Sequence, residues 1–162
     1  MKTTPLFPKI YRKVGLVVIL IAVVLLVLDE LMGLLSFLEQ ANVLAIYDSG
    51  IPLGQTRSDN RFFEIIQDDF RYETLVVLIL TGLLFVGFSK RATEDELVQK
   101  IRLESLLWAT YIHFFLFILL TLFTFGLFYL NILVFSVFTI LLIYILRFEY
   151  KMYQLKKSLH EK

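Results

Sequence analysis

The chain has 162 residues, 58% of them hydrophobic, and its mean hydropathy is +0.75. Typical soluble domains are about 45–50% apolar, so this composition favours a polytopic membrane protein. The formal net charge of +1 gives no overall field that would attract nucleic acid directly. The absence of cysteine excludes disulfides, thiolate metal sites and a cysteine nucleophile.

A basic head, residues 1–13, precedes the first apolar run, which is interrupted by Asp29 and Glu30. We interpret residues 14–36 as a retained signal-anchor helix, because no small-x-small cleavage site follows the run. A crossing of about 20 residues puts the two acids about one turn inside the far boundary. There they are either interfacial acids at a helix end or functional intramembrane groups.

Residues 39–71 make up the one sizeable segment on the far side of the predicted membrane. Apolar residues recur there at three-to-four-residue spacing, which predicts an amphipathic helix. The residues of this stripe are Phe62, Phe63, Ile66 and Phe70. Ser58 or Asp59 would cap the helix, which we expect to run straight into the second crossing at residues 72–88.

On that predicted helix two pairs of carboxylates would lie one turn apart, Glu64 with Asp68 and Asp69 with Glu73. Such pairs hold a divalent cation or work as an acid and a base, or they are solvated charges balanced by nearby arginines. No Asp-x-Asp-x-Asp-Gly loop supports calcium, and no metal site is predicted.

Residues 89–104, which follow the second predicted crossing, form a polar segment. Thr93 to Glu96 match a capping box, and no breaker follows before Thr124, so one helix is expected to begin in water and enter the bilayer near Ser105. Its charged start is a candidate docking surface for a cytoplasmic protein partner. The candidate docking residues are Glu94, Asp95, Glu96, Arg102 and Glu104.

Residues 105–146 contain no Asp, Glu, Lys or Arg. As a helix this stretch would reach about 63 Å, at about 1.5 Å per residue, whereas the hydrocarbon slab is about 30 Å thick. The stretch therefore predicts two crossings, residues 105–126 and 131–148, with a turn at residues 126–131. The predicted fold class is all-α, a polytopic membrane four-helix bundle.

Two polar side chains stand out in this last pair of crossings. His113 either carries protons or is a neutral imidazole hydrogen-bonded to Thr110, Tyr111 or a neighbouring helix, and no second ligand at metal spacing accompanies it. Arg147, at the end of the last crossing, either stacks on Trp108 and reaches Glu104 or snorkels to phosphates.

The orientation follows from the basic residues. Thirteen of the 16 Lys and Arg lie in the head, in residues 89–104 and in the end of the chain from Arg147, whose tail is residues 149–162. These three segments share one side of the four-crossing arrangement. The positive-inside rule places that side in the cytoplasm, so both termini are predicted to be cytoplasmic in a bacterial inner membrane.

The second half of the chain carries a recognisable pattern. It consists of Glu94-Asp-Glu96, Arg102-Leu-Glu-Ser-Leu106, Trp108-Ala-Thr-Tyr111 and the closing Ile145-Leu-Arg-Phe-Glu-Tyr150. This pattern resembles a family of small, uncharacterised integral membrane proteins from Bacteroidota, with no known activity. Members are sometimes encoded beside small helix-turn-helix regulators, so the resemblance implies membrane sensing or the tethering of a regulator.

Together these features predict a non-catalytic sensing, scaffolding or regulator-tethering protein without a cofactor. No nucleophile-and-base pair or phosphate-binding loop indicates an enzyme. The alternative is a small transporter or channel subunit that uses Asp29, Glu30 and His113. Partners are the lipid bilayer and a cytoplasmic protein, and the oligomeric state stays open.

Overall fold

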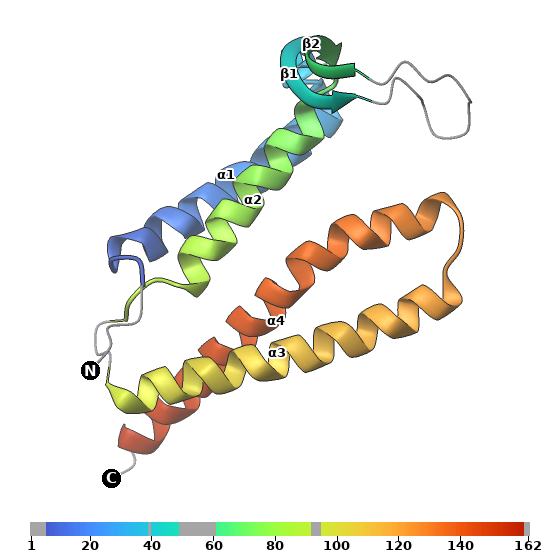
Figure 1. Cartoon of the computed structure of the whole chain (residues 1–162). Helices are drawn as coiled ribbons and strands as arrows, with labels where there is room; N and C mark the ends of the chain where they lie inside the picture. The colour runs from blue at the N-terminus through green and yellow to red at the C-terminus, as the bar shows by residue number, and fades with distance from the viewer. Residues whose placement is uncertain (1–5, 39, 49–60, 92–94, 161–162) are drawn as a thin grey trace. The chain divides into compact units, whose positions relative to one another are not determined.

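The computed structural model describes residues 6–38, 40–48, 61–91 and 95–160 (Figure 1). The chain divides into two compact units. The first unit comprises Met1–Ile19 and Leu80–Lys162, and the second comprises Leu20–Ile79. The described residues form four α-helices: α1 (Ile10–Met32), α2 (Arg71–Gly87), α3 (Glu96–Phe123) and α4 (Leu127–His160). All four are long and apolar enough to cross a membrane, which confirms the prediction of four membrane-length helices in the described residues.

The helix lengths show where the chain would extend beyond a bilayer. The 28 residues of α3 and 34 residues of α4 reach about 42 and 51 Å, against a hydrocarbon core of about 30 Å. The part of α3 beyond this thickness includes its charged first turns, and the part of α4 beyond it includes the basic tail, which is helical as far as His160. Both helices therefore carry ordered charged segments beyond their apolar spans.

A tight turn joins α3 to α4, earlier and shorter than predicted. α3 ends at Phe123 and α4 begins at Leu127, so the turn does not extend to Asn131, which is helical. Gly126 adopts φ 73°, a left-handed conformation that costs glycine little, and its carbonyl accepts from the Tyr129 N–H at 3.1 Å. This conformation reverses the chain within three residues.

The start of α3 differs from the predicted capping box. Asp95 is the N-cap, and its carboxylate accepts from the Val98 N–H at 2.9 Å. Thr93, the predicted cap, lies outside the described residues. An aspartate at the N-cap satisfies an orphan backbone donor and places negative charge at the positive end of the helix dipole.

The packed core of the first unit lies between the charged ends of α3 and α4. The two helices cross near those ends and separate towards their turn (Figure 1). Buried residues of this core are Val98, Ala109, Tyr144, Phe148 and Met152. By contrast, the side chains near the turn are mostly exposed, which is how apolar residues in contact with lipid would look without a bilayer.

The first unit also holds the beginning of α1 against the end of α2. Phe7 donates its N–H to the Phe88 carbonyl at 3.0 Å and accepts from the Lys90 N–H at 2.8 Å. Eight residues after Phe7, Gly15 approaches Gly82 so closely that a Cβ on Gly15 would lie 2.7 Å from the Gly82 carbonyl oxygen. Small residues allow such backbone contact in membrane helices. Sequence spacing does not indicate this pair, because the two glycines lie on different helices, 67 positions apart.

In the second unit the predicted outer helix is wrong, because the segment forms a β-hairpin. β1 (Ala41–Asp48) pairs antiparallel with β2 (Arg61–Asp68), and Val43 and Leu44 face Ile66 and Ile65 across the ladder. Adjacent aromatic and β-branched residues favour strands, and this preference prevails over the approximate helical spacing. The proposed caps at residues 58 and 59 lie outside the described residues.

The hairpin does not run straight into α2. Regular structure is interrupted at Asp69, between β2 and α2. The Asp69 carboxylate accepts hydrogen bonds from the backbone N–H of Arg71 at 3.1 Å and from Arg71 Nε at 2.9 Å. Aspartate commonly terminates regular structure in this way, by bonding to the backbone two residues on. α2 therefore begins as a separate helix at Arg71, with Glu73 in its first turn.

Candidate functional site

Arg102 is the central polar residue of the first unit. It is 9% exposed, and its guanidinium donates to the carbonyl oxygens of Gly87 at 2.8 Å and Ser89 at 3.3 Å, and to the Tyr144 hydroxyl at 3.2 Å. Because α2 ends at Gly87, Arg102 supplies positive charge and donors to the carbonyl end of that helix. One arginine of α3 thus holds the end of α2 against α4.

Aromatic residues of α4 complete this cluster. Tyr144 is fully buried, donates its hydroxyl to the Gly87 carbonyl at 2.9 Å and stacks on Phe88 at a centroid distance of 5.3 Å. The guanidinium carbon of Arg102 lies 4.6 Å from the centroid of the Phe148 ring. Hydrogen bonding and cation–π contact together offset the cost of burying the charge.

This placement corrects the predicted docking surface. Arg102 is buried and faces the interior, so it is not available to a partner. Asp95 uses its carboxylate as a helix cap, and Glu94 lies outside the described residues. Of the predicted set, Glu96 and Glu104 have exposed side chains that a partner could reach.

A second charged cluster joins the two ends of the chain. Glu149 of α4 forms an ion pair with Arg12 of α1 at 3.1 Å, and it also pairs with Arg91 after the end of α2. Partial burial lowers the pKa of Arg91, and the negative charge of Glu149 opposes this change. The contact ties together three segments that the orientation analysis places on the same side of the membrane.

Arg147 makes the contact proposed from the sequence. Its guanidinium carbon lies 4.7 Å from the centroid of the Trp108 ring, and one of its terminal nitrogens is 3.9 Å from a Glu104 carboxylate oxygen. The stacking alternative is therefore present in the structure. Residues 108 and 147 face each other because the hairpin turn lies nearly midway between them.

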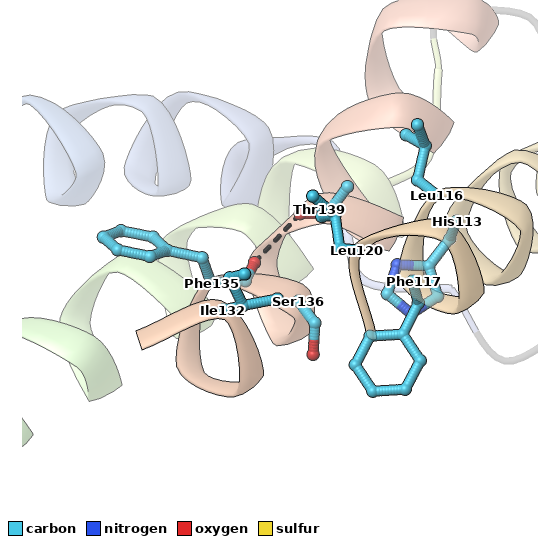
Figure 2. A pocket seen from close by; sticks show the side chains of 8 residues that line it. All are labelled: His113, Leu116, Phe117, Leu120, Ile132, Phe135, Ser136 and Thr139. Carbon is cyan, nitrogen blue, oxygen red and sulfur yellow. Dashed lines mark hydrogen bonds between the residues drawn. The ribbon is translucent and has the colours of Figure 1, made fainter. Parts of the chain in front are cut away.

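His113 lines a small cavity between α3 and α4, with a volume of about 120 Å³ (Figure 2). Its ring stacks on Phe117, and Ser136 and Thr139 contribute the other polar groups. The predicted hydrogen bond is absent at Nδ1, which is buried and has no partner among the described residues. Thr110 donates instead to the carbonyl of Leu106.

Both hydroxyl groups that line this cavity donate hydrogen bonds to backbone carbonyls. Ser136 donates to Leu133 at 2.7 Å and Thr139 donates to Phe135 at 2.9 Å, the latter drawn as a dashed line in Figure 2. Such bonds back to the preceding turn are usual for hydroxyl residues in apolar helices. The cavity is therefore mainly apolar, with one unsatisfied imidazole nitrogen.

In the second unit, Asp29 has a structural role. Its carboxylate accepts from the Leu35 N–H at 2.8 Å and lies 3.8 Å from a terminal nitrogen of Arg71. These contacts hold the chain as it leaves α1, whereas Glu30 is exposed. The interfacial interpretation of Asp29 therefore fits better than a role in a polar path.

The paired carboxylates of the predicted outer helix are not brought together. Residues 64 and 68 lie in a strand, where four residues span about 13 Å, and Asp69 is separated from Glu73 by the start of α2. Asp69 instead binds Arg71, whose side-chain hydrogen bond lowers the pKa of the carboxyl group. Within the described residues no group of three His, Asp or Glu side chains could hold a metal ion.

Sequence reasoning missed the pairing of Arg12 with Glu149 and the burial of Arg102. The first pair is separated by 137 residues, so no local spacing could indicate it. A usable signal was that Glu149 is an isolated acid beside the basic end of the last crossing, on the same predicted side as the basic head. For Arg102, the signal was its helical spacing with the buried Val98 and Ser105.

Comparison of the chain with family models, with curated proteins and with solved structures finds no match in any of the three. The resemblance to the Bacteroidota membrane family therefore stays a prediction from the motifs of the second half.

Proposed function

We propose that the chain is a non-catalytic, four-span protein of a bacterial inner membrane that tethers a cytoplasmic protein. Both termini and the segment between α2 and α3 lie in the cytoplasm in this proposal. The basic residues of these segments support that orientation through the positive-inside rule. Ion pairs from Glu149 to Arg12 and Arg91 support it too, because they require the three segments to share one side.

One observation carries the tethering proposal: the first turns of α3 are anchored on one face and exposed on the other. Val98, Arg102 and Ser105 are buried, whereas Leu97 is 48% and Leu103 is 61% exposed. Glu96 and Glu104 add charge to the exposed face. A fixed helix with mixed apolar and charged exposure is suited to recognising a protein surface.

A shallow groove beside this face gives the proposed partner a place to bind. It has a volume of about 390 Å³. Its lining residues are Phe88, Gln99, Lys100, Arg102, Leu103 and Leu106. The lining combines apolar side chains with the positive charge of Lys100. The proposed partner segment is therefore an amphipathic helix that places an acidic residue at Lys100 and basic residues at Glu96 and Glu104.

The test is affinity purification of the full-length protein in mild detergent, comparing wild type with Glu96→Lys/Glu104→Lys. We expect the double variant to lose a protein that copurifies with wild type, because the charges at the exposed face are reversed. Asp68→Lys/Glu73→Lys makes the same change in net charge in the second unit and should retain the partner. An identical set of copurifying proteins for all three would contradict the tethering role.

A second candidate function is passage of a proton or small solute through the spans. The His113 cavity favours it, since a buried imidazole nitrogen without a hydrogen bond is unusual in apolar surroundings. The transporter hypothesis drawn from the sequence also includes Asp29 and Glu30. In the structure, however, the Asp29 carboxylate accepts a hydrogen bond from the Leu35 N–H and lies close to Arg71. Liposome flux that is absent in wild type, or equal in wild type and His113→Ala, would exclude it.

A further inference from the structure

A groove of about 440 Å³ in the first unit is surrounded by cationic side chains. The lining residues are Lys9, Arg12, Lys13, Leu16, Lys90 and Arg91. They come from two segments, the start of α1 and the residues that follow α2. Main-chain hydrogen bonds between Phe7 and residues 88 and 90 join these segments, so the groove depends on contacts distant in sequence.

The charged side chains among the described residues that line this groove are all basic. No Asp or Glu is among the described residues that line it. Glu149 contacts both Arg12 and Arg91, so one carboxylate holds two guanidiniums in place at the groove. Nε of Arg12 is buried and has no hydrogen-bond partner within the described part of the chain. The described lining of the groove is therefore rich in basic side chains.

The described lining also includes one apolar side chain, Leu16, which lies about one helical turn after Lys13 on α1. Leu16 is 52% exposed and its neighbour Val17 is 55% exposed. A soluble anion would use the cationic part alone. A molecule with an anionic head and hydrocarbon chains would use both parts, because the apolar surface of α1 begins where the charges end.

We propose that this groove binds the phosphate-bearing headgroup of an anionic phospholipid, with its acyl chains along α1. Clusters of lysine and arginine at the cytoplasmic ends of membrane helices attract anionic lipids, and guanidinium groups bind phosphate oxygens through charge-assisted hydrogen bonds. The inference rests on membrane insertion, but it does not depend on the protein partner proposed above.

The experiment uses native mass spectrometry of the purified full-length protein, loaded with phosphatidylglycerol or phosphatidylcholine. The groove variant is Lys9→Gln/Lys13→Gln/Lys90→Gln, which leaves Arg12, Arg91 and Glu149 intact. We expect wild type to retain phosphatidylglycerol in preference to phosphatidylcholine, and the groove variant to bind it about tenfold or more weakly. The matched control, Lys151→Gln/Lys156→Gln/Lys157→Gln, removes the same charge from the helical tail and should retain the lipid.

Three outcomes would overturn the proposal. Equal loss in the groove and tail variants would mean general attraction to positive charge. Equally tight binding of soluble glycerol 3-phosphate would mean that the apolar half is not used and that a free phosphate is the ligand. Loss in the variant with Lys9, Lys13 and Lys90 replaced by arginine would also contradict it, because that variant keeps the charges. The arginine variant further controls for any loss of folding in the glutamine variant.

Discussion

The two halves of the α3–α4 hairpin treat their polar residues differently. At the charged end, Arg102 is buried but bonds to Gly87, Ser89 and Tyr144. Nearer the turn, His113 Nδ1 is buried without a partner among the described residues. A permanent charge is excluded from apolar surroundings unless several groups stabilise it, whereas a neutral imidazole is tolerated at a cost of about 1–3 kcal/mol. The comparison indicates that Arg102 is structural and that the His113 cavity is an incompletely satisfied site.

The largest expected effect on the free energy of unfolding comes from replacing Arg102. Arg102→Leu should lower the free energy of unfolding by about 3 kcal/mol, because it removes charge-assisted hydrogen bonds to the end of α2. Thermal or denaturant unfolding in detergent micelles measures this change. Arg147→Leu in the same hairpin is the matched control, since it loses a partly exposed stacking contact on Trp108 and should cost about 1 kcal/mol or less. Equal losses in the two variants would contradict the structural role of Arg102.

A smaller effect is expected where α1 approaches α2. Gly15→Leu should destabilise the protein by about 1–3 kcal/mol, because the new side chain would press on the backbone of Gly82. Val14→Leu adds bulk at the neighbouring, 42% exposed position and should be neutral. Unfolding of both variants under the same conditions tests this; tolerance of Gly15→Leu would mean that the two helices are not in contact there.

Replacing His113 is expected to cause almost no loss of stability, in contrast to replacing Arg102. His113→Phe removes an unsatisfied nitrogen and retains an aromatic ring, so stability should stay within about 1 kcal/mol of wild type or rise. A thermal scan in detergent checks this. A clear loss of stability would show that the imidazole nitrogen has an essential partner.

The smallest effect concerns the exposed Asp69. Its pKa is lowered in the folded state by hydrogen bonds from Arg71, relative to a usual value of 3.8. A lowered folded pKa contributes stability that is present above the unfolded pKa and is lost as the pH falls through the folded pKa. Wild type should therefore lose slightly more stability below about pH 4 than Asp69→Asn does. Parallel melting curves at neutral and acidic pH would reveal the difference, and identical acid dependence would count against the contact.

Much of the helical arrangement was predictable because lipid-length apolar runs leave few alternatives. The uncharged residues 105–146 could be accommodated only as two helices and a turn, and the contact of Arg147 with Trp108 followed from that geometry. The β-hairpin was not predicted, because Phe62, Phe63 and Ile66 fit a helical stripe almost as well as a strand. Pairing with β1, which decides between the two, depends on residues about 20 positions away.

The candidate sites were less predictable than the helices. The sequence predicts that Arg102 lies on the surface, since charged side chains are rarely buried unless they are paired. Its partners are mainly carbonyl oxygens at the end of α2, and backbone groups leave no signature in a sequence. The basic groove likewise depends on bringing Lys9 and Lys90 together, which only the folded chain does.

Cysteine accessibility tests the central claim, four spans with the basic segments on one side, most directly. The chain has no cysteine, so single variants report without background. We would label Lys9→Cys, Asn42→Cys, Gln99→Cys and Gln154→Cys with a membrane-impermeant maleimide in intact bacterial spheroplasts. The account predicts that Asn42→Cys is labelled at once and that the other three react only after permeabilisation. Labelling of Lys9→Cys and Gln154→Cys from opposite faces would contradict it.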